Sequence, residues 1–359
     1  MIEMKNLMKD SLVSQILEKG GRIEPLIIDS DKTGGVGLCN PSLWHKPDTT
    51  KYLVNVREVS YYLHHCEGDQ KYQTPWGPLN YVRPDDDPHL RTQNWMCDFN
   101  LRNQKLTNPR KIDTSEFEKE PEWDFVGLED ARIVEWEGAM YVTGVRRFAP
   151  DGKGRMVLSE IEIDNKTVKE VGRYVMLPPE GEEHYCEKNW MPILDRPFHF
   201  VKWANPIEVI KVDINRKWKK NPKKYRVPSQ FVYRGNDDPN VEKLPFQLDP
   251  RGSSQVIPYN GYYMAVVHEC DYWHNEKNDR DAHYYHRFMV WDKDWQIVTY
   301  SDPFKFMDGR IEFCCGMAQH PDEEHGGVYI TFGFQDNTAY KIHVPKQVLE
   351  DMMEFPKEE

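Results

Sequence analysis

The chain has 359 residues, 39% of them hydrophobic and 13% aromatic, which is enough for one large domain or two ordinary ones with a sizeable core. Its formal net charge of −12 argues against a general nucleic-acid binder, because phosphate contacts need a basic face. The apolar runs are too short to span a bilayer, and the start MIEMKNLMKD lacks the apolar segment of a secretory signal. We therefore expect a cytoplasmic protein with no nucleic-acid or membrane partner, and homo-oligomer formation stays open.

Seven cysteines are scattered along the chain without CxxC spacing. An odd, scattered set fits buried thiols in a reducing compartment better than a disulfide framework or a zinc site. The sequence therefore predicts no metal.

Helical periodicity is confined to the two ends of the chain. The segments NLMKDSLVSQILEKG and PKQVLEDMMEF predict helices, and Gly20 ends the first. Between them lie short strands rich in Val, Ile, Tyr, Phe and Trp, separated by Gly, Pro, Asn and Asp. We expect an all-β fold with a helical extension at 1–28, a catalytic domain at 29–345 and a C-terminal helix and tail at 346–359.

The segment GLEDARIVEWEGAMYVTGVRR, residues 127–147, predicts a hairpin with charge at both ends. The acids Glu129 and Asp130 precede the first strand, a turn follows at 137–138, and the second strand ends at Arg146 and Arg147. The middle of this hairpin is apolar and should be buried, whereas its charged ends should not.

A polar motif followed by two strands recurs along the chain. An aromatic residue opens the second strand each time, and these residues are 57 to 89 positions apart, which fits one four-stranded sheet each. Five such sheets arranged radially would make a five-bladed β-propeller, whose innermost strand ends meet at one shared funnel. The recurring segments are NPSLWHKPDTTKYLVNVR, LEDARIVEWEGAMYVTGVRR, EKNWMPILDRPFHFVKW, GSSQVIPYNGYYMAVVHE and EFCCGMAQHPDEEHGGVYITFGFQD, with Tyr52, Tyr141, Phe198, Tyr262 and Tyr329 as the aromatic residues.

The funnel would collect carboxylates, cations and amides that are far apart in sequence. Carboxylates can serve as acid, base or ligands of sugar hydroxyls, and grouped Arg, Lys and His can hold phosphate. Ion pairs that cap the blade ends are the alternative for any single residue. The expected set is Asn40, Arg57, Glu129, Asp130, Arg146, Arg147, Glu187, Lys188, Asn189, His268, Glu312 and Asp336.

Several other segments invite a functional interpretation that their context does not favour. The basic stretch 216–226 is interpreted as a solvated loop, and Asp85-Asp86-Asp87 as a polar turn between prolines. The glycine-rich 34–37 is followed by Asn40-Pro41 and no helix, which argues against a dinucleotide fold.

The long polar segment 58–100 is expected to form a lid or a wall of the funnel.

Taken together, the motifs resemble glycoside hydrolase family 130. The resemblance rests on GLEDARI before a hairpin, a Lys-Asn motif at 188–189, a histidine after YYMAVV, and GFQD at 333–336, and it covers roughly residues 35–345. Asn40-Pro41 and Arg57 match the family's first motif, whereas Ala131 stands where the family usually has proline. The family contains inverting β-mannoside phosphorylases and β-mannosidases on a five-bladed propeller, so the resemblance implies that fold.

The resemblance also implies roles for the residues of the funnel. Asp130, beside Glu129, would be the general acid and would protonate the leaving oxygen through a sugar hydroxyl. The implied mannosyl ligands are Asn40, Arg57 and Asp336, and the implied phosphate ligands are Arg146, Lys188 and His268, with Arg147 or Arg155 joining them.

The predicted activity is inverting phosphorolysis of a β-mannosidic bond to mannose 1-phosphate, or its reverse, on a mannose-containing oligosaccharide. Inorganic phosphate would be the co-substrate, and no cofactor is expected. An inverting hydrolase would instead need a second carboxylate about 6.5–9.5 Å from the acid, and Glu187 or Glu312 could hold water or substrate. A β-mannosidase, a mannosyltransferase of the same fold and a non-catalytic glycan-binding propeller remain the alternatives.

Overall fold

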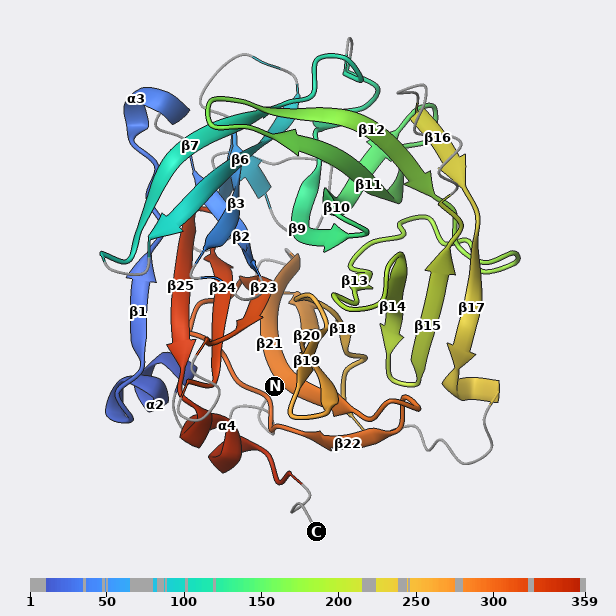
Figure 1. The fold of residues 1–359 in the computed structure, drawn as a ribbon. Helices are drawn as coiled ribbons and strands as arrows, with labels where there is room; N and C mark the ends of the chain where they lie inside the picture. The colour runs from blue at the N-terminus through green and yellow to red at the C-terminus, as the bar shows by residue number, and fades with distance from the viewer. Residues whose placement is uncertain are drawn as a thin grey trace.

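The computed structural model of the protein consists mainly of β-strands, which confirms the all-β expectation (Figure 1). No helix within the described residues is long and apolar enough to cross a membrane. The described residues are 11–34, 37–46, 49, 51–64, 80–82, 87, 89–100, 103–118, 121–214, 224–237, 244, 246–274, 280–321 and 326–355.

A ten-stranded sheet contains two antiparallel runs of four strands each. Two parallel residue pairs join the outer strands β7 and β12 of these runs. The first run is β2 (Leu38–His45), β3 (Tyr52–Val59), β6 (Leu90–Asn100) and β7 (Lys105–Asp113). The second run is β9 (Glu129–Trp136), β10 (Ala139–Phe148), β11 (Lys153–Ile163) and β12 (Val168–Met176).

Three further antiparallel runs follow along the chain. The third is β13 (Met191–Pro192), β14 (His199–Ala204), β15 (Ile207–Val212) and β17 (Ser229–Arg234). The fourth is β20 (Tyr262–His274), β21 (Arg280–Trp291) and β22 (Ile297–Tyr300), with β18 (Arg251–Gly252) and β19 (Ile257–Tyr259) both paired to β20. The fifth is β23 (Glu312–Gln319), β24 (Val328–Phe334), β25 (Thr338–Val344) and β1 (Arg22–Pro25).

The runs lie around the middle of the molecule, with β1, β7, β12, β17 and β22 at the periphery (Figure 1). The five aromatic residues that mark the recurrence each lie within two residues of the start of the second strand of a run, namely Tyr52 (β3), Tyr141 (β10), Phe198 (before β14), Tyr262 (β20) and Tyr329 (β24).

The predicted hairpin at 127–147 is confirmed as β9 and β10. Its turn residues Glu137 and Gly138 have φ of 52° and 77°, which is the left-handed pair that a tight hairpin turn requires. The middle of the hairpin is buried, as expected from its apolar sequence.

The remaining elements are short and lie at the ends of the chain or beside the runs. Helix α2 (Leu12–Glu18) begins at Ser11, whose hydroxyl accepts the Ser14 amide, and α4 (Lys346–Met352) follows the last strand. Both helices fall inside the predicted segments, although the first ten residues lie outside the description. Also present are α3 (Ser30–Thr33), η2 (Gly235–Asp237), β4 (Tyr62–His64), β5 (Asn80–Val82), β8 (Phe125–Val126) and β16 (Lys224–Val227).

The N-terminal segment is more than a helical extension, because β1 pairs with β25 and supplies the outer strand of the fifth run. Of the predicted lid at 58–100, the structure describes part of β3, β4, β5, β6 and a few connecting residues, and 65–79 lie outside the description. The basic stretch 216–226 also lies mostly outside it, apart from the start of β16, which pairs in parallel with β12.

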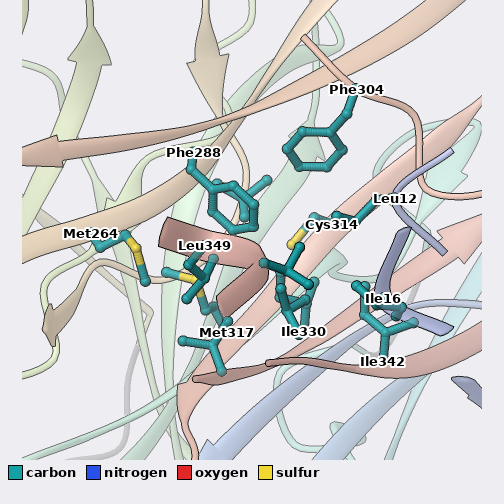
Figure 2. Close-up of a cluster of buried hydrophobic side chains, with 14 of the residues drawn as sticks. Leu12, Ile16, Met264, Phe288, Phe304, Cys314, Met317, Ile330, Ile342 and Leu349 are labelled. Carbon is teal, nitrogen blue, oxygen red and sulfur yellow. The ribbon is translucent and has the colours of Figure 1, made fainter. Parts of the chain in front are cut away.

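The hydrophobic core consists mainly of clusters between neighbouring runs. Figure 2 shows the largest, which joins the fourth and fifth runs and includes Phe288, Met317 and Ile330, with Leu12 of α2 and Leu349 of α4 packed on it. Similar clusters lie between the second and third, third and fourth, fifth and first, and first and second runs. Each run is therefore packed between two neighbours, and the contacts close into a ring.

A fully buried glutamine ties three inner strands together at the centre. Gln255 donates from Nε2 to the carbonyls of Leu43 (2.9 Å) and Ile133 (3.0 Å), and its Oε1 accepts the Met317 amide at 2.9 Å. These partners belong to β2, β9 and β23. Because buried polar groups are costly unless hydrogen-bonded, this network fixes the inner strands relative to each other.

Candidate active site

A polar cleft of about 110 Å³, here called the central cleft, receives side chains from all five runs. It brings together eight of the twelve residues that the sequence analysis expected in the funnel. Its lining comprises Asn40, Arg57, Tyr61, Phe125, Glu129, Asp130, Lys188, Asn189, Arg251, His268, Cys270, Tyr272, Tyr284, Ile311, Phe313 and Asp336.

Four residues that line the central cleft have left-handed backbone conformations. These are Asn40 (φ 43°), Asp130 (φ 53°), Asn189 (φ 64°) and Asp336 (φ 49°). Asn and Asp tolerate this region better than other side chains, and such strain gathers at functional sites where the surroundings enforce it. The local kinks turn these four side chains out of the strand pattern and into one space.

Asp130 is the best-fixed carboxylate of the central cleft. Its Oδ1 accepts hydrogen bonds from Asn40 Nδ2 at 2.7 Å and from Arg57 NH1 at 2.8 Å. Asn40 Nδ2 also lies 3.4 Å from Asp336 Oδ1, and Arg57 NH2 lies 3.7 Å from Glu129 Oε2. Asn40 and Arg57 of the first run thus hold three carboxylates from the second and fifth runs at the same place.

The three carboxylates of the central cleft differ in their pKa values. Burial raises the pKa of Asp130, but Arg57, Arg132 and the hydrogen bond from Asn40 outweigh it and hold that pKa below its ordinary value. Burial raises the pKa of Glu129 above its ordinary value despite Arg57, and the neighbouring Asp130 adds to this. The same cause, burial, raises the pKa of Asp336. Of the three carboxyl groups, Asp130 is therefore the last to take up a proton as the pH falls.

Two cations line the central cleft without an acidic partner. Within the described part of the chain, neither Lys188 nor Arg251 makes an ion pair within 4 Å. Lys188 nevertheless acts electrostatically on Glu129, Asp130 and Asp336, lowering the pKa of each. Cations that face a cleft and are not neutralised by the protein are suited to bind an anion.

His268 adds a neutral donor beside these cations. Burial, His286 and the cations Lys188 and Arg251 hold the pKa of His268 well below its usual range. Its ring stacks on Tyr284 with centroids 5.5 Å apart, and its Nδ1 lies 3.3 Å from the Ser253 hydroxyl. A neutral imidazole whose Nδ1 accepts from Ser253 carries its proton on Nε2, where it can donate one hydrogen bond.

Arg132, from the EDAR motif, supports the site from below. It is fully buried and donates to the carbonyls of Asp130 (2.6 Å) and Ser253 (2.8 Å), with Asn189 Oδ1 at 3.5 Å. The loops of the second, third and fourth runs are therefore held by one guanidinium.

Glycine is required at position 333, opposite Asn40, because a Cβ at Gly333 would lie 2.0 Å from the Asn40 amide oxygen.

Arg146 and Arg147 do not line the central cleft. They line a neighbouring cavity of about 430 Å³, here called the arginine cavity, between the first and second runs. Arg146 is buried and forms an ion pair with Glu118, and Arg147 donates to the Gly152 carbonyl at 3.2 Å. Phe125 lines both spaces, so the two are adjacent.

Glu187 and Glu312 also lie outside the central cleft, and their carboxylates bind the protein itself. Glu187 accepts from the His184 amide at 3.0 Å and from Trp190 Nε1 at 3.1 Å. Glu312, fully buried, accepts four backbone amides at 306–309 and so holds that loop. Arg155 is engaged as well, donating to the carbonyls of Gly154 and His184 and pairing with Glu183.

The sequence analysis missed Arg251 and the aromatic lining of the central cleft. Arg251 stands directly before the GSSQ motif and pairs with His268 across β18 and β20, a register that the recurrence of motifs could have suggested. Tyr61, Tyr272 and Tyr284 lie beyond the quoted motifs and carry no signal of their own. Among the described residues no group of three or more His, Cys, Asp or Glu side chains is arranged to hold a metal ion.

The comparison with solved structures shows a likeness of fold. One similar structure, with a TM-score of 0.51, comes from glycoside hydrolase family 130. That family is described as mannoside phosphorylases that include glycoside hydrolases targeting β-1,2 mannosidic linkages in Candida mannan. The two chains are 13% identical, and the match covers 87% of this chain and 85% of that one. The resemblance expected from the motifs is thus found again in the fold.

Two other solved structures are similar at slightly lower scores. A β-1,2-mannobiose phosphorylase from Listeria innocua has a TM-score of 0.49 at 10% identity, covering 88% of this chain and 92% of that one. A mannose phosphorylase from Leishmania mexicana, in complex with phosphate, has a TM-score of 0.49 at 11% identity, covering 96% and 97%. No family model and no curated protein sequence matches the chain.

Proposed function

We propose that this protein is a carbohydrate-active enzyme that cleaves, or in reverse forms, β-mannosidic bonds by inverting phosphorolysis. We also propose that its five antiparallel runs are the blades of a five-bladed β-propeller, with the central cleft at the mouth of its channel. One observation carries the function: Lys188 and Arg251, which make no ion pair among the described residues, line the same cleft as three carboxylates.

The packing of the runs supports the proposed propeller. Propeller blades are four-stranded antiparallel sheets that face each other around an axis. The ring of core clusters between successive runs and the contacts of Gln255 with β2, β9 and β23 fit that arrangement. The N-terminal strand β1 pairs with β25 and so completes the fifth run, which would close the ring of blades.

The phosphate would bind between Lys188, Arg251 and the Nε2 of His268. Phosphate is itself a competent nucleophile, so a phosphorylase needs cations that place it and no base that activates water. A neutral histidine suits this site, because it donates a hydrogen bond without a third charge to be neutralised. Arg251 thus replaces Arg146 and Arg147 in the phosphate site that the motifs predicted.

The mannosyl unit would lie on the opposite side, against Asn40, Arg57 and Asp336. Their amide, guanidinium and carboxylate groups offer both donors and acceptors to sugar hydroxyls. A phosphate oxygen would attack the anomeric carbon while the bond to the leaving oxygen breaks. The configuration inverts in this single displacement, and the leaving oxygen takes a proton from the protein.

The proton would come from Asp130 and Glu129 acting as one coupled pair. The pKa of Glu129 is raised and that of Asp130 is lowered, so a proton shared by the pair would lie on Glu129. A phosphate bound at Lys188 cancels the cation that favours ionised Asp130. Binding of the anion would then raise the pKa of Asp130 and load the acid for transfer through a sugar hydroxyl.

Hydrolysis is less well supported by the same side chains. An inverting hydrolase needs a free carboxylate that holds water about 6.5–9.5 Å from the acid. The candidates Glu187 and Glu312 accept hydrogen bonds from the protein and lie outside the central cleft lining.

The test is incubation of the protein with β-mannosides, first β-1,2-mannobiose because the fold relative is described as acting on β-1,2 linkages. We expect mannose 1-phosphate to form, with the α configuration by NMR, at a rate that depends on phosphate. Release of free mannose without phosphate would favour hydrolysis, and binding without turnover would favour a glycan-binding protein.

A further inference from the structure

We infer that the arginine cavity binds a phosphomonoester on the sugar next to the scissile bond, so that the substrate's leaving group is a phosphorylated sugar. This rests on the proposed function for the central cleft and adds the class of acceptor. The cavity of about 430 Å³ is larger than the central cleft and lies beside it, with Phe125 in the wall of both.

The floor of the arginine cavity is a neutralised network of buried charges. Arg173 donates from Nε and NH2 to the two oxygens of Glu170, at 2.8 and 2.6 Å, and lies 3.2 Å from Glu118. Glu118 also pairs with Arg146, whose Nε is buried and has no hydrogen-bond partner. Burial, with the neighbouring Arg173, lowers the pKa of Arg146 to about 9.

Two cations above this floor are left over for a ligand. Arg147 is half-buried, and its buried Nε has no hydrogen-bond partner within the described part of the chain. Its guanidinium donates to a carbonyl and lies over two aromatic rings. Lys111 is exposed and makes no ion pair within the described part of the chain. The acids Asp113 and Glu122 also line the cavity, and both are exposed.

Two uncompensated cations match the double charge of a phosphomonoester at neutral pH better than the single charge of a carboxylate. Hydroxyl and amide groups of Thr114, Ser115 and Gln93 line the same space, as a sugar requires. An uncharged sugar would leave Arg147 and Lys111 without a counter-ion.

The position of the arginine cavity ties it to the reaction. The Arg147 guanidinium carbon lies 5.9 Å from the centre of the Phe125 ring, and the charge of Arg147 lowers the pKa of Glu129 in the central cleft. A disaccharide with its mannosyl unit at Asp130 can therefore pass over Phe125 and place its second sugar in the arginine cavity.

The test measures binding by calorimetry, so that it does not depend on turnover. Glucose 6-phosphate, glucuronate and glucose are titrated into the full chain as wild type, Arg147→Met, Lys111→Met and Lys188→Met. We expect glucose 6-phosphate to bind at least tenfold more tightly than the other two sugars. Arg147→Met and Lys111→Met should each weaken it about tenfold, the effect of one charge-assisted contact, and Lys188→Met should not.

Three results would overturn the inference: equal affinity for glucose and glucose 6-phosphate, equal or tighter binding of glucuronate, or a loss of glucose 6-phosphate binding in Lys188→Met but not in Arg147→Met. The proposed function fails separately, if no mannoside yields mannose 1-phosphate. A protein that binds glucose 6-phosphate through Arg147 without phosphorolysis would keep the arginine cavity and lose only the reaction.

Discussion

The central cleft and the floor of the arginine cavity hold the same kinds of charged side chains but treat them in opposite ways. In the floor, Arg173 lies between Glu170 and Glu118, and every acid has its cation. In the central cleft, Lys188 and Arg251 face space, and Lys188 acts on acids that it does not contact. A neutralised network belongs to the architecture, whereas uncompensated charge beside a cavity is a binding capacity. The predictions below test this distinction.

The largest effect is expected at the acid of the central cleft. Asp130→Asn keeps the hydrogen bond that Asp130 accepts from Arg57 but cannot donate an acidic proton. Because general acid catalysis contributes about 10²–10⁴-fold, we expect phosphorolysis to fall by about 10³-fold. The initial rate of mannose 1-phosphate release measures this, with circular dichroism as the check on folding. Asp213→Asn, at an exposed aspartate, is the matched control, and wild-type rates in Asp130→Asn would remove Asp130 from catalysis.

The second effect is on the free energy of unfolding, which should fall when a cation of the neutralised floor is removed but hardly change when a cation of the central cleft is removed. Arg173→Met would leave Glu170, which is fully buried, with only the Ser159 hydroxyl as a partner. Breaking a buried pair in this way costs about 3–5 kcal/mol of unfolding free energy. Lys188→Met, which breaks no ion pair, should cost less than about 0.5 kcal/mol. Urea denaturation of the two variants measures both values, and equal midpoints would contradict the distinction between the two regions.

The third effect is on phosphate binding, where we expect a large change from Lys188→Met although its effect on stability is small. Lys188→Met removes a charged contact to phosphate, so we expect the KM for phosphate to rise about tenfold or more while the KM for the mannoside changes little. Arg251→Met should act in the same direction. Lys211→Met, at an exposed lysine of β15, is the control. A larger change in the mannoside KM than in the phosphate KM would place Lys188 on the sugar side.

The parts of the site that follow strand ends could be predicted from sequence. Asn40, Asp130 and Lys188 lie near the start of the first strand of three runs, and His268 and Asp336 lie in or after the second strand of the other two. Recognising the recurrence was therefore enough to expect them together. The hairpin at 127–147 was predictable for a similar reason, since its turn and its apolar middle are local features.

The parts that depend on partners could not be predicted. Glu312 resembles a free carboxylate in sequence, but the loop at 306–309 folds back and presents four amides to it. Arg146 and Arg147 stand at the end of β10, and only the packing of the first run against the second decides that they enter another cavity. Arg251 has no motif of its own and gains its position through pairing with β20.

The smallest expected effect is a shift in the pH dependence of the reaction. The proton-loaded form of the Glu129–Asp130 pair is the active one, so kcat/KM falls as pH rises through the pKa of the pair. Lys188 favours the ionised carboxylates and lowers both pKa values. Lys188→Met should therefore move the alkaline limb of kcat/KM for the mannoside, measured at subsaturating phosphate, to higher pH by on the order of one unit. Lys211→Met should leave the limb in place. A kcat/KM that instead rises with pH through this range would mean that the ionised pair is the active form, and that Asp130 acts as a base rather than as the acid proposed here.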